Sequence, residues 1–252
     1  MLSDPWFWVA AVPAVLIAGI AKGGFSGGAA FAATPMIALA VGPVNAAAIM
    51  LPLLMVMDVL ALRSWWGKWS WPDARLLILG AVPGIALGAW LFRSVDEDVL
   101  RLALGTMSVA FVAYMLAKGR GWIEVPTRER LNPVSAGGWG AVCGFTSFVT
   151  HAGGPPAAMH MLSRPLTKGQ FQGTSVILFA CVNLMKAPCY AALGLFGNAN
   201  LGASAALAPL AAIGIGLGVW LHRRVSERLF YAIIYVFLTL IGLRLIASGL
   251  GY

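Results

Sequence analysis

The chain has 252 residues, of which 60% are hydrophobic and only 10% are charged. A soluble domain carries about 25% charged residues, and apolar runs long enough to cross a bilayer recur along this chain. Its composition excludes a soluble globular domain and indicates an integral membrane protein. The formal net charge of +8 comes from basic residues beside apolar segments, which orient a chain in a membrane, so we do not expect nucleic-acid binding.

Ten apolar segments follow one another, five in each half of the chain. In chain order we expect helices over residues 6–21, 28–41, 43–63, 74–92 and 99–117, then 134–149, 154–163, 168–196, 202–221 and 227–249. The second segment of each set is too short to cross, because about 14 residues at a rise of about 1.5 Å cover only about 20 Å of a core about 30 Å thick. The first two segments of each half therefore predict a broken or re-entrant hairpin.

The two halves repeat each other. Residues 88–95 (GAWLFRSV) align with 218–225 (GVWLHRRV), and Glu97 then falls on Glu227 in the same register. Such agreement is typical of a duplicated unit rather than of an array. We expect three parts: a first membrane repeat over 1–117, a cytoplasmic linker over 118–133 and a second membrane repeat over 134–252.

Basic residues predict the orientation. If each hairpin stops inside the membrane, the loops on one side of the membrane hold twelve basic residues. The loops on the other side hold only Arg93 and Arg101. Those twelve are Arg63, Lys68, Arg75, Lys118, Arg120, Arg128, Arg130, Arg164, Lys168, Arg223, Arg224 and Arg228. The positive-inside rule places these loops in the cytoplasm and both termini outside, as expected for a multi-pass protein of the cell inner membrane.

Each half then crosses three times, or five times if the hairpin arms do cross. Either odd number inverts the second repeat relative to the first. The predicted fold is an all-α membrane protein with two inverted repeats, whose glycine-containing hairpins meet near the bilayer midplane. Whether the short arms cross fully is left open.

Two glycine-rich breaks, over 21–28 and 149–156, interrupt apolar runs beside an ionisable residue. Backbone exposed in this way is tolerated at membrane depth only where it lines a protein cavity. Glycines let an anion approach backbone N–H groups at the start of a half-helix, lysines add positive charge, and Ser or Asn side chains donate hydrogen bonds. The candidate substrate-binding residues are Lys22, Gly23, Gly24, Ser26, Gly27, Gly28, His151, Gly153, Gly154, Asn183 and Lys186.

Each ionisable candidate has a structural alternative. Lys22 could snorkel to a membrane surface instead of facing the cavity. Asp58 could form a structural ion pair with one of the lysines or act as a coupling residue. His151 could carry a proton coupled to anion movement, or cap a half-helix as a neutral imidazole. The three histidines have no acidic partner at metal-ligand spacing, so we expect no metal and no other cofactor.

Several motifs resemble the sulfite exporter (TauE/SafE) family of membrane transporters. They are 144–156 (GFTSFVTHAGGPP), Gly173-Thr174 and 182–188 (VNLMKAP) in the second half, and 23–28 (GGFSGG) and 80–84 (GAVPG) in the first. The resemblance implies transport of sulfite, organosulfonates or other sulfur-containing anions. Lys22 departs from the uncharged residue of many relatives, which points toward a different anion.

The predicted function is therefore secondary transport of a small anion across the inner membrane, with His151 and Asp58 as candidates for proton coupling. A passive anion channel would use the same cavity and is left open, as is assembly into a homodimer. An intramembrane hydrolase using Ser26 or Ser147 with His151 ranks well below, because no carboxylate close in sequence orients the histidine. We expect a protein that is not an enzyme, with an anionic substrate and the lipid bilayer as its partners.

Overall fold

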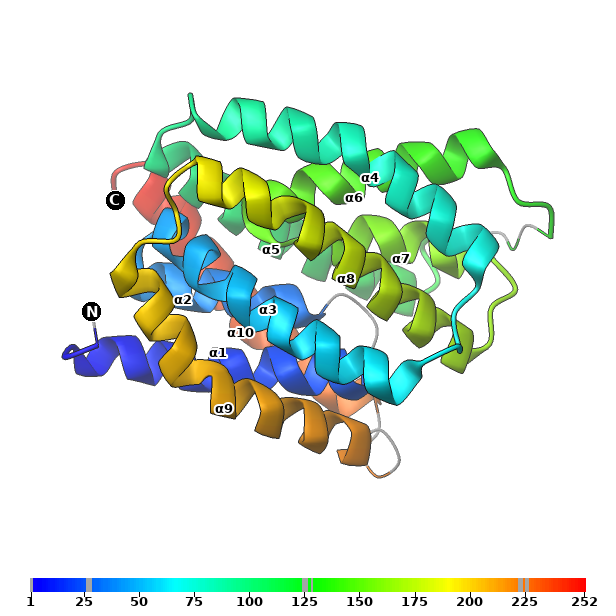
Figure 1. Ribbon diagram of the computed structural model, residues 1–252, viewed down its shortest axis with the longest axis horizontal. Helices are drawn as coiled ribbons and strands as arrows, with labels where there is room; N and C mark the ends of the chain where they lie inside the picture. Colours follow the sequence, from blue (N-terminus) through cyan, green and yellow to red (C-terminus); the bar gives the residue numbers. More distant parts are fainter. Residues whose placement is uncertain (1, 26–28, 124–126, 128, 222–223, 225–226) are drawn as a thin grey trace.

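The computed structural model describes residues 2–25, 29–123, 127, 129–221, 224 and 227–252, and in this part of the chain every regular element is a helix (Figure 1). The elements are α1 (Pro5–Gly24), η1 (Ala29–Ala32), α2 (Ala33–Val41), α3 (Pro43–Trp65), α4 (Trp71–Phe92), α5 (Glu97–Gly119), α6 (Pro133–Thr150), α7 (Gly154–Leu162), α8 (Lys168–Ala192), α9 (Asn198–Leu221) and α10 (Glu227–Gly249). All ten predicted apolar segments are helical, which confirms the segment order.

Local signals start several of these helices. The Asp4 carboxylate accepts a hydrogen bond from the Trp6 amide at 3.0 Å, and Asn132 caps α6 in the same way. Thr167 and Gln170 form a reciprocal capping box at the start of α8. These caps satisfy amide groups that have no partner inside the helix, so the helix starts follow from local sequence.

Within the described residues, seven helices are long and apolar enough to cross a membrane: α1, α3, α4, α5, α8, α9 and residues 231–249 of α10. The chain is therefore a multi-pass membrane protein. The second segments of each half are short, as predicted, since α2 and α7 have nine residues each. With 20 residues, α1 is long enough to cross, whereas α6 has 18 and is not among the seven.

The two halves of the chain are interlocked. α1 packs along α9, α4 packs along α6, α5 along α10, and α3 contacts both α8 and α9. Figure 1 shows α1 beside α9, and α4 beside α6, at opposite edges of the bundle. Each of these contacts joins a helix of the first half to one of the second, and each of the three buried hydrophobic clusters contains residues of both halves.

Glycines allow the interlocked helices to approach closely. A Cβ atom on Gly19 of α1 would lie 2.8 Å from the Gly214 Cα of α9, and one on Gly144 of α6 would lie 2.8 Å from the Ala81 Cα of α4. Small residues at helix contacts are the usual means of close packing in membranes, where no hydrophobic effect drives helices together.

The connections are sorted between the two ends of the molecule. The marked N- and C-termini lie at one end, while α3 ends and α4 and α8 begin at the other (Figure 1). Lys68, Arg164 and Lys168 lie near these latter helix ends. The basic loops that the sequence grouped together are thus grouped in space where they are described.

A buried polar network ties that basic end together. Asp73, near the start of α4, accepts hydrogen bonds from Ser70 Oγ at 2.6 Å and Arg164 Nε at 3.0 Å, and its Oδ1 lies 3.0 Å from His160 Nε2. His160 belongs to α7 and Arg164 to the loop that follows it. The short helix α7 is therefore anchored at its C-terminal end through a charged contact with α4.

The close contact between α4 and α6 predicts a sharp difference between two glycines of α6. Gly144→Ala forces a methyl group against the Ala81 backbone and should cost about 1–3 kcal/mol of stability, as overpacking usually does. Gly138→Ala has open space around it and should be neutral or slightly stabilising, because alanine favours a helix. Thermal unfolding of both variants in detergent checks this, and equal melting temperatures would contradict the contact.

Candidate functional site

The first break is satisfied by side chains from other helices. At the end of α1, the Lys22 carbonyl accepts a hydrogen bond from Gln172 Nε2 at 2.8 Å, and the Gly23 carbonyl accepts one from Trp65 Nε1 at 3.1 Å. Gln172 lies in α8 and Trp65 in α3. Carbonyl groups at a helix end have no partner within the helix, so this ending of α1 depends on tertiary contacts.

His151 is the residue at which the second break begins. Among the described residues it is the only non-glycine with a positive φ, at 56°, and it ends α6 in the left-handed conformation. Such a position usually holds glycine, and a side chain kept there is a reason to look for function. The Ser147 and Phe148 carbonyls of the last turn accept hydrogen bonds from Lys186 Nζ at 2.8 Å and Tyr190 Oη at 2.7 Å, both from α8.

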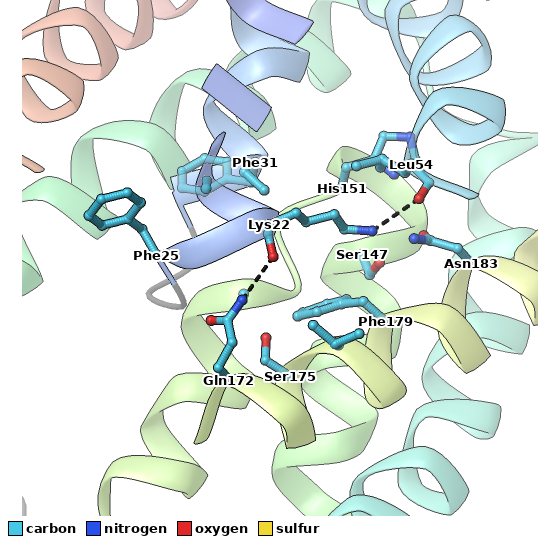
Figure 2. A pocket seen from close by; sticks show the side chains of 14 residues that line it. Lys22, Phe25, Phe31, Leu54, Ser147, His151, Gln172, Ser175, Phe179 and Asn183 are labelled. Atoms are coloured by element: carbon cyan, nitrogen blue, oxygen red, sulfur yellow. Dashed lines mark hydrogen bonds between the residues drawn. The ribbon is translucent and has the colours of Figure 1, made fainter. Parts of the chain in front are cut away.

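A cavity of about 60 Å³ lies between the two breaks. This volume accommodates a few water molecules or one small ion. The cavity is lined by Ala21, Lys22, Phe25, Ala30, Phe31, Leu54, Ser147, His151, Gly154, Gln172, Ser175, Val176, Phe179 and Asn183. Figure 2 shows the Lys22 side chain reaching across it toward Leu54, with Asn183 and His151 nearby. Residues of both breaks thus face one cavity.

Lys22 lies at the centre of a first polar cluster. Its Nζ forms an ion pair with Asp58 and donates a hydrogen bond to the Leu54 carbonyl at 3.1 Å. The second carboxylate oxygen of Asp58 accepts a hydrogen bond from Asn183 Nδ2 at 2.7 Å. Lys22 therefore lines the cavity, and it is the lysine that pairs with Asp58, which was one of the two alternatives for that carboxylate.

Lys186 and His151 form a second cluster. Lys186 Nζ contacts three acceptors: the Ser147 carbonyl at 2.8 Å, Ser147 Oγ at 3.1 Å and His151 Nδ1 at 2.8 Å. His151 Nε2 lies 3.0 Å from the Ala47 carbonyl. A carbonyl only accepts, so Nε2 carries a hydrogen. His151 Nδ1 and Lys186 Nζ then share one hydrogen bond, which links the two residues directly.

Counted with every side chain in its usual ionised form, the two clusters hold one more positive than negative charge. In the described part of the chain, Lys22 and Lys186 bring two ammonium groups against the single carboxylate of Asp58, and all three side chains are buried or nearly so. Each break joins the C-terminal end of one helix to the start of the next, so the helix dipoles oppose each other. The formal charges therefore decide the sign of the site, which is positive when both lysines and Asp58 are ionised.

The predicted site residues lie at different distances from the cavity. Lys22, His151, Gly154 and Asn183 line the cavity. Lys186 and Asp58 do not line it but contact residues that do. Gly24 is buried at the end of α1, Gly23 packs against Gly218 of α9, and Gly153 packs against Ser147. Ser26, Gly27 and Gly28 lie outside the described residues.

Sequence reasoning missed a stripe of residues on α8. Gln172, Ser175, Val176 and Phe179 line the cavity together with Asn183. Their spacing of three or four residues places them on one face of a helix. The same spacing continues to Lys186, so extending the polar pattern backward from Lys186 and Asn183 would have found them.

The arrangement does not resemble a hydrolase. Both ring nitrogens of His151 are engaged, one by Lys186 and one by the Ala47 carbonyl, and Ser147 Oγ accepts from Lys186. The other serine considered, Ser26, lies outside the described residues. Among the residues that the structure describes, no group of three or more His, Cys, Asp and Glu side chains is placed to hold a metal ion.

Comparison with known proteins identifies a family. The family model described as Sulfite exporter TauE/SafE matches residues 11–245. No curated protein and no solved structure matches the chain significantly. The matched range runs from α1 into the last turns of α10 and contains the whole cavity.

The buried ion pair predicts a strongly non-additive mutant cycle. Lys22→Met or Asp58→Leu alone leaves a buried charge without its partner and should cost about 3–5 kcal/mol. The double variant removes both charges and should cost clearly less than the sum. Unfolding of the four proteins in detergent measures this, with Arg101→Gln as the control, because its exposed pair with Glu97 should contribute at most about 1 kcal/mol. Additive losses would contradict a coupled pair.

Proposed function

This chain belongs to the sulfite exporter TauE/SafE family of membrane transporters, and we propose that it is a secondary transporter. In this proposal it binds one small sulfur oxyanion in the cavity between the two helix breaks. Members of the family are transporters and not enzymes. Sulfite and small organosulfonates are the substrates we expect, moved across the cell inner membrane.

The observation that carries this proposal is the excess positive charge beside the cavity. An isolated ammonium group in apolar surroundings is costly, and an anion that enters the cavity would offset that cost. A singly charged anion would bring the formal charge of the Lys22, Asp58 and Lys186 groups to zero. A cation would instead meet repulsion from both lysines.

The cavity walls suggest how the anion would be held. Lys22, Ser147 and Ser175 line the cavity and offer hydrogen-bond donors to oxyanion oxygens. Phe31 and Phe179 supply apolar walls that exclude water and strengthen these contacts. Backbone amides contribute less than we expected from the sequence, because Pro155 and Pro156 at the start of α7 have no N–H group.

The helix pairing supports an inverted-repeat mechanism. α1 packs on α9 while α6 packs on α4, which is the reciprocal exchange expected if the first and second halves are equivalent. In our proposal both termini face outward, the basic loops are cytoplasmic and the two hairpins are re-entrant. Movement of one repeat against the other would then open the cavity to each side in turn.

Coupling would come from cooperative binding of the anion and a proton. An anion held by Lys22 weakens the attraction between Lys22 and Asp58, so Asp58 becomes easier to protonate in its buried position. The same anion makes it more favourable for His151 to take up a proton. Anion and proton would therefore bind together, and a proton gradient would drive the anion.

Reconstituted flux tests the function directly. Proteoliposomes with an imposed pH gradient should accumulate sulfite or a small sulfonate against its own gradient, while thiosulfate and carboxylates serve as comparison anions. A passive channel would only equalise concentrations. Absence of uptake for every anion in a folded preparation would overturn the proposal.

The buried lysine behind the cavity predicts a loss of anion affinity. Lys186→Gln removes the excess charge and should weaken anion binding about tenfold or more, equivalent to about 1.4 kcal/mol. Lys68→Gln removes a lysine that lies over the Trp65 ring, 5.1 Å from its centroid, and should leave binding unchanged. Binding measured by substrate-dependent thermal shift distinguishes them, and equal affinities would show that Lys186 is structural.

His151 predicts the pH dependence. If a protonated His151 helps to hold the anion, transport should fall as pH rises through the range in which the imidazole loses its proton. His151→Gln can still donate to the Ala47 carbonyl and accept from Lys186, but it does not titrate. Its flux in proteoliposomes should therefore be nearly flat with pH. A profile equal to that of the parent would leave Asp58 as the coupling candidate.

A further inference from the structure

A second hollow lies far from the transport cavity in sequence, between α5 and α10. It has a volume of about 850 Å³ and takes all of its lining from the C-terminal part of α5, the residue after it, and the N-terminal part of α10. The lining residues are Val112, Met115, Leu116, Lys118, Gly119, Arg120, Tyr231, Ala232, Tyr235, Val236, Thr239 and Leu240. We call it the α5/α10 groove.

The shape of the groove follows from residue size along the helix pair. α5 and α10 run antiparallel and touch closely where a Cβ on Gly105 would lie 2.8 Å from Ile246 Cγ1 and one on Gly242 would lie 3.0 Å from Ser108 Cβ. At the other end, the large side chains of Tyr231 and Tyr235 line the groove, with ring centroids 5.8 Å apart. Small residues therefore bring the helices together at one end of the pair, and large residues line the groove between them at the other.

The two ends of the groove differ in polarity. Lys118 and Arg120 lie where α5 ends, and the Arg120 guanidinium lies over the Trp122 ring, 5.3 Å from its centroid. Trp122 is 74% exposed, as expected for a side chain at a membrane interface. Deeper along the helices the walls are apolar, with Met115 and Leu240 among them.

We propose that the α5/α10 groove binds one anionic phospholipid, with its phosphate between Lys118 and Arg120 and an acyl chain along the apolar walls. The proposal goes beyond the transport function and does not depend on it. Both helices are long and apolar enough to span the membrane, so lipid is the molecule that surrounds them.

Charge and length both match this occupant. Basic pockets between membrane helices are suited to anionic headgroups, and the guanidinium group of Arg120 can hold phosphate oxygens with paired hydrogen bonds. From Tyr231 to Leu240 the helix rises about 14 Å at about 1.5 Å per residue. This matches one leaflet of a core about 30 Å thick.

Lipid retention by the purified full-length protein tests the proposal. The protein is mixed with equimolar phosphatidylglycerol and phosphatidylcholine in detergent, and bound lipid is counted by native mass spectrometry. The parent should retain one phosphatidylglycerol with a preference of about tenfold or more, given two basic contacts. Lys118→Gln combined with Arg120→Gln should abolish the preference.

Two further variants separate a specific site from general basicity. Arg224→Gln removes an arginine that also stacks on a tryptophan, 4.8 Å from the Trp220 ring centroid, but that does not line the groove, and it should keep the preference. Val236→Trp fills the apolar wall, leaves both cations in place and should lower retention of both lipids. Thermal unfolding confirms that each variant is folded.

Several results would overturn the proposal. The first is equal retention of both lipids by the parent, and the second is an unchanged preference in the Lys118 and Arg120 variant. The third is complete displacement of the lipid by millimolar inorganic phosphate, which would mean that the site recognises phosphate without the acyl chain. The variant Val236→Cys tests the other occupant. If it forms an intermolecular disulfide in membranes, a second copy of the chain covers the groove.

Discussion

Backbone carbonyl and amide groups cannot remain unpaired in hydrocarbon, and the centre of this protein is organised around that constraint. Two helices end inside the bundle, α1 at Gly24 and α6 at Thr150. The carbonyls at each end are paired by side chains from other helices, Gln172 and Trp65 at the first and Lys186 and Tyr190 at the second. These donors come from α3 and α8, so the two breaks are attached to both of these helices. The cavity lies between the two breaks.

The interlocking of the halves brings the two breaks together. α1 is held against α9, and α6 against α4, by contacts in which glycines replace side chains. The ends of α1 and α6 are also linked through α8, whose side chains hydrogen-bond to both, although more than a hundred residues separate the two ends. A transporter with alternating access would have to move such contacts as units, since closely packed interfaces do not deform gradually.

The polar residues at the breaks have structural roles and, in the proposed transport, functional ones. Lys186 pairs with the end of α6, where a cation is favoured by the helix dipole, and it also supplies charge behind the cavity. His151 holds a left-handed backbone position while bonding to both Lys186 and Ala47. The strain at His151 is maintained by contacts on both sides of its ring, which is the usual condition for a strained residue at a functional site.

The ten helical segments, the two breaks and the ionisable residues beside them were determined by the sequence itself. Apolar length, glycine clusters and caps such as Thr167 with Gln170 act within a few residues of the chain, so they can be read locally. The sequence did not determine which of these ionisable residues pair with each other. Both Lys22 and Lys186 were candidates to pair with Asp58, and only the packing of α1 against α3 assigns Lys22 to it.

The tertiary structure also decided which candidates face the cavity. Gly23 and Gly153 looked like anion-binding glycines, yet the structure places them in close helix contacts, while Gln172 and Phe179 line the cavity without having been singled out. The α5/α10 groove is likewise absent from any local pattern. Which face of a helix meets which neighbour depends on how interlocked helices pack across distant parts of the chain, and hydropathy along one segment does not contain that information.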